Sequence, residues 1–207
     1  MNKKPYLLII KLFLAAIPLW LLMIYYVIDD PFKIINDYEE FYTNQSRELF
    51  INRDHVSTRL YIKNYPLYHY DSFIFGSSRS YAFLAKEWQK YILSPAFHFD
   101  ASGESLFGIY TKIKYLYLNK RPLKNCLIII NAGLLSKTFN NEETALIKDP
   151  EISGESRLKY HYKFFTAFLT GGFFVPYFAW KAGSINRLFL DYPPVQKKWF
   201  VHYRLCN

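Results

Sequence analysis

The chain has 207 residues, enough for one domain and a membrane anchor but not for two domains of ordinary size. Its net charge is +9, but the basic residues are scattered among acidic and aromatic ones, which argues against a nucleic-acid partner. The charge fits either affinity for an anionic envelope or lipid surface, or an ordinary solvated basic surface. Two cysteines are too few for a disulfide framework, and we expect Cys126 to be buried and not bonded to Cys206.

The first element is an apolar run at residues 6–28, near the length that crosses a hydrocarbon core. Its single charge, Lys11, lies close enough to one end to reach the head groups, and Tyr25 and Tyr26 suit the membrane interface. A cleaved signal peptide is the alternative. The run is longer than an ordinary signal-peptide core and no small-residue cleavage site follows it, so the sequence favours an uncleaved anchor.

The flanking charges predict how this anchor is oriented. Lys3 and Lys4 precede it, and Asp29 and Asp30 follow it. By the positive-inside rule, residues 1–5 form a cytoplasmic tail and the rest of the chain lies outside the cytoplasm. We therefore expect a single-pass protein of the cytoplasmic (inner) membrane.

A juxtamembrane segment, residues 29–70, follows the anchor and is rich in charge and tyrosine. Its pattern predicts helices around Phe32–Tyr42 and His55–Lys63. We expect this segment to connect the anchor to a domain at residues 71–207 and to pack on that domain.

Alternating strands and helices begin that domain. The expected strands are Asp71–Phe75, Ala96–Asp100 and Cys126–Asn131, and the expected helices lie at Ser80–Leu93 and around residues 106–117. Strand, helix, strand, helix, strand is typical of a parallel sheet with helices on both faces. The sequence therefore predicts a three-layer α/β domain.

The pattern is less regular after Asn131. Residues Arg157–Thr170 are predicted to be helical and to end at Gly171 and Gly172. The aromatic run Phe173–Trp180 fits either a strand or a helix, and residues 192–207 have no clear period.

Each expected strand ends in a turn of glycine and small polar residues: Gly76–Arg79, Ala101–Glu104 and Asn131–Gly133. The carboxyl ends of parallel strands meet at one edge of the sheet, where open α/β sheets bind their ligands. The three turns are therefore expected to lie close together.

The chemistry of these turns suits acyl transfer. A serine such as Ser78, at a sharp turn from strand to helix, exposes its hydroxyl near backbone N–H groups. The N–H groups of Ser78 and Gly103 and the amide of Asn131 are candidate donors to an oxyanion. Ser77 and Arg79 are candidate substrate contacts. The alternatives are a helix cap for Ser78, a solvated side chain for Arg79 and a turn residue for Asn131.

Gly-Ser-Ser after an apolar strand, a glycine turn after the next strand and an asparagine after the third resemble the SGNH (GDSL-type) hydrolase superfamily. The resemblance covers about residues 71–135 and is closest to a membrane-anchored branch, which includes D-alanyl-transfer-like and polysaccharide O-acetylation-like envelope proteins. It implies a flavodoxin-like sheet. It also implies Ser78 as nucleophile, with Gly103 and Asn131 at the oxyanion.

The chain departs from this family in its C-terminal part. The family's catalytic Asp-x-x-His is absent; Asp191 and His202 are the late candidates, at a different spacing, and His202 is the tentative base. His161 falls in a predicted helix, and His98 is interpreted as a packed strand residue. Because only three strands are evident, we expect an incomplete sheet, shortened at its C-terminus, with an open edge where a fourth strand belongs.

Two functions follow from this reading. The first is an extracytoplasmic esterase or O-acyltransferase that acts on a cell-envelope polysaccharide through an acyl-serine intermediate. The second is a catalytically inactive or truncated relative that binds glycan or a partner protein, because a serine without a base is a poor nucleophile. The expected partners are the membrane and an envelope polysaccharide or acyl-donor protein. No cofactor or metal ion is expected.

Overall fold

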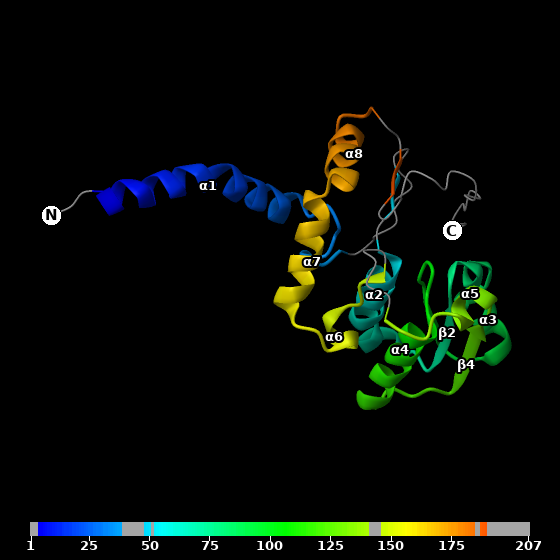
Figure 1. Ribbon diagram of the computed structural model, residues 1–207. Coiled ribbons are helices and arrows are strands. Elements are labelled where there is room, and N and C mark those ends of the chain that lie inside the picture. The colour runs from blue at the N-terminus through cyan, green and yellow to red at the C-terminus, as the bar shows by residue number, and fades with distance from the viewer. Residues whose placement is uncertain (1–3, 39–47, 51, 141–145, 185–186, 190–207) are drawn as a thin grey trace. The chain divides into compact units, whose positions relative to one another are not determined.

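The chain divides into two structural units, residues 1–41 and residues 42–207. In the computed structural model (Figure 1) the described residues are 4–38, 48–50, 52–140, 146–184 and 187–189.

A three-stranded parallel sheet organises the larger unit. Strand β2 (Ser72–Gly76) lies in the centre, with β3 (Ala96–Phe99) on one side and β4 (Asn125–Ile129) on the other. Phe75 of β2 lies in register with Phe99 of β3 and Ile128 of β4. The three predicted parallel strands are confirmed. With the first of them in the middle, their order matches the first three strands of a flavodoxin-like sheet.

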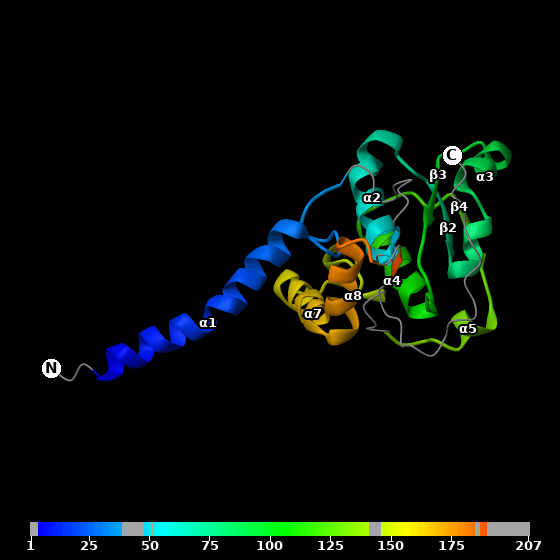
Figure 2. The ribbon, with the colours of Figure 1, turned by 90° about the horizontal axis from the view of Figure 1, so that it is seen from above.

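Helices cover both faces of this sheet. After β2 come a 3₁₀ helix, η1 (Ser78–Ala82), and α3 (Ala85–Ile92), and α4 (Leu106–Leu118) connects β3 to β4. In Figure 2, α3 lies on one side of the strands, and α4 and α2 (Arg53–Tyr68) lie on the other. The two crossovers run in opposite directions along the sheet, so right-handed connections place their helices on opposite faces. The predicted three-layer α/β architecture is confirmed.

Helix α2 contains the predicted helix His55–Lys63 and is longer at both ends. It begins after Asn52, whose side-chain oxygen accepts the N–H of His55 at 3.0 Å. It ends at His69, which takes a left-handed conformation with φ of 47°.

The hydrophobic core lies between the sheet and helices α2 and α4. The rings of Phe75 and Phe99 stack with their centroids 5.5 Å apart, and Tyr61 of α2 lies 5.0 Å from Phe99. The other members of the cluster are Tyr65, Phe73, Ile109, Leu116, Leu134 and Ile152. Each large side chain buried in this way contributes about 1.5–3 kcal/mol. The core therefore includes α2, which precedes the expected domain start at residue 71.

The chain after β4 is mainly helical. It forms α5 (Ala132–Leu135), α6 (Pro150–Ser153), α7 (Arg157–Leu169) and α8 (Gly171–Lys181). The predicted helix at residues 157–170 is confirmed. The break lies at Thr170, which is extended (φ −70°, ψ 139°), so the two glycines open α8 instead of forming a loop.

The aromatic run at residues 173–180 is helical, and Phe168 of α7 contacts Phe173 and Tyr177 of α8. A separate parallel pair joins β1 (Glu48–Phe50) to β5 (Arg187–Phe189), two strands that the sequence did not predict. Residues 192–207 lie outside the described part of the chain.

Strand β4 is an edge strand. Among the described residues it pairs only with β2, as expected for a sheet with an open edge. The prediction that Cys126 is buried is wrong, since it is exposed, and Ile128 is 38% and Ile130 60% exposed. The packing that buries Phe73 and Phe75 completely on the central strand does not extend over these neighbours on β4.

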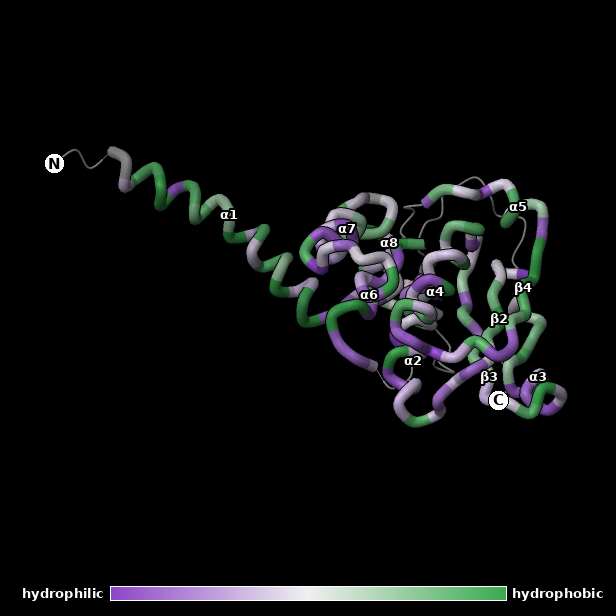
Figure 3. Tube along the Cα trace, turned by 90° about the horizontal axis from the view of Figure 1, so that it is seen from below, coloured by the Kyte–Doolittle hydropathy of each residue, from purple (hydrophilic) through white to green (hydrophobic). Residues whose placement is uncertain are grey.

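Helix α1 (Lys4–Asp29) forms most of the smaller unit. Its 24 residues Tyr6–Asp29 include an 18-residue window with a mean hydropathy of 2.6, so the helix is long and apolar enough to cross a membrane. Figure 3 shows this hydrophobic character along the helix. The predicted apolar helix is confirmed. A signal sequence shares these features, so anchoring and orientation remain predictions.

A turn built around Asp30 follows α1. The predicted helix at Phe32–Tyr42 is wrong for its described part, residues 32–38. The buried Asp30 carboxylate accepts the backbone N–H groups of Ile34, Ile35 and Asn36 at 2.8–3.0 Å. Side-chain bonds of this kind compete with helix formation.

Candidate functional site

The first turn at the sheet edge is unusually tight. After β2 the chain enters η1, where the Ser80 hydroxyl donates to the backbone oxygen of Ser77 at 2.7 Å. A Cβ atom at Gly76 would lie 2.6 Å from the Cβ of Ser80, so only glycine permits this approach. The turn buries Ser77 and exposes Ser78 and Arg79.

The third turn is hydrogen-bonded to the first. The Asn131 side chain caps α5, since its oxygen accepts the N–H of Leu134 at 3.0 Å, and its amide nitrogen donates to the Ser77 hydroxyl at 2.6 Å. This bond joins the ends of β2 and β4, where the chain changes direction across the sheet. Open α/β sheets bind ligands at this switch point. Asn131 thus caps α5, and its amide nitrogen is also a hydrogen-bond donor at the sheet edge.

The second turn is tied to the first through Tyr81. The Tyr81 and Ser102 hydroxyl oxygens lie 2.6 Å apart, and burial raises the pKa of Tyr81 above its usual value. Gly103 takes a left-handed conformation with φ of 69°, which favours glycine. All three turns therefore meet at one edge of the sheet. Ser77 links the third turn to the first, and Tyr81 of η1 links the second turn to it.

Ser78 differs from its polar neighbours at this edge. It is exposed, and its hydroxyl makes no hydrogen bond with any described residue. The position before η1 is occupied by Ser77, so the helix-cap alternative for Ser78 gains no support from these contacts. Arg79 is exposed as well.

The structure places one histidine beside the first turn. His98 Nε2 lies 2.9 Å from the Ser80 hydroxyl, and burial lowers the pKa of His98. Ser80 directs its proton to the Ser77 oxygen, so His98 in its Nε2–H form donates to Ser80. Ser80 is completely buried, so the pair fixes the turn and offers no accessible nucleophile. His161 lies in α7, as predicted.

Asp191 and His202 lie outside the described residues, so neither is placed relative to Ser78. Within residues 48–140 and 146–184, no histidine is bonded to the Ser78 hydroxyl. The described chain also contains no group of three or more metal-ligating side chains.

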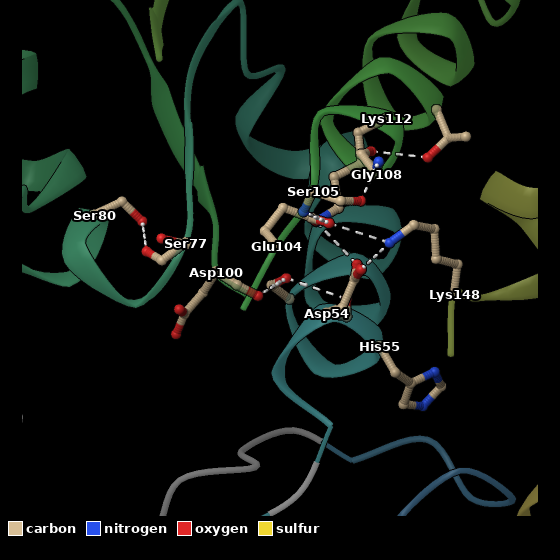
Figure 4. A network of polar contacts seen from close by, with 12 residues as sticks. Asp54, His55, Ser77, Ser80, Asp100, Glu104, Ser105, Gly108, Lys112 and Lys148 are labelled. Carbon is tan, nitrogen blue, oxygen red and sulfur yellow. Dashed lines mark hydrogen bonds and ion pairs between the residues drawn. The ribbon is translucent and has the colours of Figure 1, made fainter. Parts of the chain in front are cut away.

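A buried ring of four charges lies behind the second turn (Figure 4). Lys112 contacts Asp54 at 2.9 Å and Glu104 at 2.5 Å, and Lys148 contacts the same carboxylates at 2.8 and 3.3 Å. All four side chains are at most 4% exposed. We call this set the charge ring. It joins α2, the second turn, α4 and the segment before α6.

Opposite charges within the ring stabilise the ionised forms of its side chains. Burial alone raises the pKa of Asp54, but Lys112 and Lys148 outweigh it and lower that pKa to about 2. Burial likewise lowers the pKa of Lys112, but Asp54 and Glu104 hold it above its usual value. All of these attractions favour the ionised forms.

Sequence reasoning missed the charge ring, although one signal was present. Lys112 falls on the same helical face as Ile109 and Leu116, which are buried in the core. A lysine within an apolar stripe indicates a buried partner. The sequence did not indicate that the partners are Asp54 and Glu104.

No family model, curated protein or solved structure matches the chain.

Proposed function

We propose that the chain is a membrane-anchored, SGNH-like serine esterase or O-acyltransferase that acts outside the cytoplasm on a cell-envelope polysaccharide. One observation carries the proposal: the hydrogen bond from Asn131 to Ser77 at the switch point of the sheet. It draws the third turn onto Ser77, the residue that directly precedes the exposed Ser78. The apolar helix α1 supports the location at a membrane.

In this proposal the Ser78 oxygen attacks an acyl carbonyl carbon and its proton passes to a base. The base then gives this proton to the donor oxygen, which leaves as an alcohol, and an acyl-serine ester remains. Water or a sugar hydroxyl then attacks this ester and releases Ser78. The oxyanion accepts from the N–H groups of Ser78 and Gly103 and from the Asn131 N–H not used by Ser77. The exposed Arg79 binds the substrate. The structure does not support Ser77, the other candidate contact from the sequence, because Ser77 is buried and its hydroxyl accepts from Asn131.

The proposal assigns the base to His202. His98 is engaged with Ser80, which leaves His202 as the assigned candidate from the sequence. Its test is a His202→Ala variant, which should lose acyl-serine formation while the protein remains folded. Unchanged formation would remove His202 from the mechanism.

Fluorophosphonate labelling of the full chain in membranes tests the nucleophile. Wild type should be labelled and Ser78→Ala should not. Ser136→Ala, which removes another exposed hydroxyl, is the matched control and should label like wild type. Equal labelling of wild type and Ser78→Ala would show that Ser78 is not an activated nucleophile.

A second function, a non-catalytic envelope protein that binds glycan or a partner protein, is favoured by a different observation. No described side chain contacts the Ser78 hydroxyl as a base would. Glycan-array binding that is unaffected by Ser78→Ala, together with no turnover of acetyl esters, would favour this function. Esterase activity of the purified chain would exclude it.

The proposed topology places residues 1–5 in the cytoplasm and the larger unit outside it. A reporter that is active only outside the cytoplasm should be active when fused after Asn207. A stable but silent fusion would reverse the orientation. Alkaline carbonate should leave the protein in the membrane pellet; its release would argue against a spanning anchor.

A further inference from the structure

Polar contacts hold the second turn at both of its ends, and residues of α2 take part in both sets of contacts. At its start, Asp100 receives hydrogen bonds from Arg53 at 2.8 Å and, through its backbone oxygen, from Ser57 at 2.9 Å. At its end, Glu104 shares Lys112 and Lys148 with Asp54. Arg53, Asp54 and Ser57 all belong to the first turns of α2.

Glu104 is also hydrogen-bonded to the backbone at the end of the turn. It follows Gly103, and one of its carboxylate oxygens accepts the N–H of Ser105 at 2.9 Å. Ser105 in turn caps α4 by accepting the N–H of Gly108 at 3.0 Å. The position of the carboxylate thus determines where the turn ends and α4 begins.

We propose that the charge ring is the positioning element of the second turn: it fixes Ser102 and Gly103 at the sheet edge beside the first turn. Its residues touch no reacting atom, so they are positioning residues and not catalytic ones. A benefit for catalysis rests on the proposed function, but the positioning itself does not.

The ring suits this task because each lysine contacts both carboxylates. Displacing Glu104 costs two buried ion pairs at once and leaves Lys112 and Lys148 with one carboxylate between them. Buried charges left unpaired are strongly unfavourable, so the turn is held where all four ion pairs can form. The arrangement therefore defines one position for the turn.

Backbone hydrogen exchange of the full chain in detergent tests the proposal without any need for activity. Two double variants each remove Lys112 and one acid, so the remaining buried pair is neutral. Glu104→Gln/Lys112→Met keeps Asp54 with Lys148 but disconnects the turn. Asp54→Asn/Lys112→Met keeps Glu104 with Lys148. Lys114→Met, an exposed position on the same helix, is the control.

Exchange at residues 101–107 should rise about tenfold or more in the variant that lacks the Glu104 carboxylate, with β2 unchanged. The variant that keeps Glu104 should exchange more slowly in this segment, and the Lys114→Met control should match wild type. Equal exchange of the segment in the two double variants would overturn the proposal. So would an increase that is the same in the turn and in β2, because the ring would then support only global stability.

Discussion

Replacing Gly108 with alanine should destabilise the protein, although the same change usually stabilises a helix. Gly108 lies in α4, directly against the charge ring. An added Cβ would lie 2.6 Å from the Lys148 nitrogen and would overlap the Glu104 carboxylate. Glu104 is the end of a flexible side chain, but it can move away only by giving up its contacts with Lys112 and Lys148.

The expected magnitude follows from two opposing terms. Alanine in place of glycine within a helix gains about 1 kcal/mol. Breaking a buried ion pair by displacing one partner costs about 3–5 kcal/mol. The net loss is therefore about 2–4 kcal/mol in the free energy of unfolding, a large part of the stability of an ordinary domain.

Denaturant unfolding of the full chain in a mild detergent, followed by far-UV circular dichroism, measures this change. The matched control is Gly172→Ala in α8, where the new Cβ would have no atom within 4 Å. It should be neutral or stabilise by up to about 1 kcal/mol. If Gly108→Ala stabilises the protein as the control does, the Glu104 carboxylate does not lie against Gly108 and the charge ring is not assembled as described.

Three further predictions concern pH and the sheet edge. The stability that Asp54 contributes should be present above pH ~4 and lost as pH falls toward 2. The stability that Lys112 contributes should be lost only above pH ~10.5. The free energy of unfolding should therefore show no change due to the charge ring between these two limits. Because burial lowers the pKa of His98, only the unfolded chain protonates this histidine just below pH 6.5. The free energy of unfolding should therefore decrease as the pH falls through this range, and His98→Gln should remove that part of the pH dependence. Ile130→Lys, next to the open edge of β4, should reduce self-association in size-exclusion chromatography with light scattering, and an unchanged mass distribution would count against an exposed associating edge.

Much of the fold could be predicted because its signals are local. Three short apolar runs bounded by turn residues marked the strands, and parallel topology followed from the helices between them. Residues 80–93 show the limit of this approach. The apolar spacing predicted one amphipathic helix, but the chain forms η1 and then α3, which has no buried residue. The close approach of Ser80 to Gly76 creates the tight turn, and no periodicity reports such a contact.

The meeting of the three turns was also predictable, since parallel strands bring their carboxyl ends to one edge. The bonds that join the turns were not. Asn131 was expected to be a turn residue or an oxyanion donor, and its amide proves to be bonded to Ser77. The charge ring was harder still, because Asp54 and Lys148 are separated by 94 positions. Charged residues so far apart are ordinarily interpreted as solvated surface.

The contrast between Ser78 and the polar side chains around it bears on which proposed function is correct. Four hydroxyl groups around it form hydrogen bonds with another turn residue or with His98, and so have a structural role: those of Ser77, Ser80, Tyr81 and Ser102. Ser78 is exposed, and no described side chain uses its hydroxyl. The fluorophosphonate experiment therefore addresses a hydroxyl at this edge that no described residue uses.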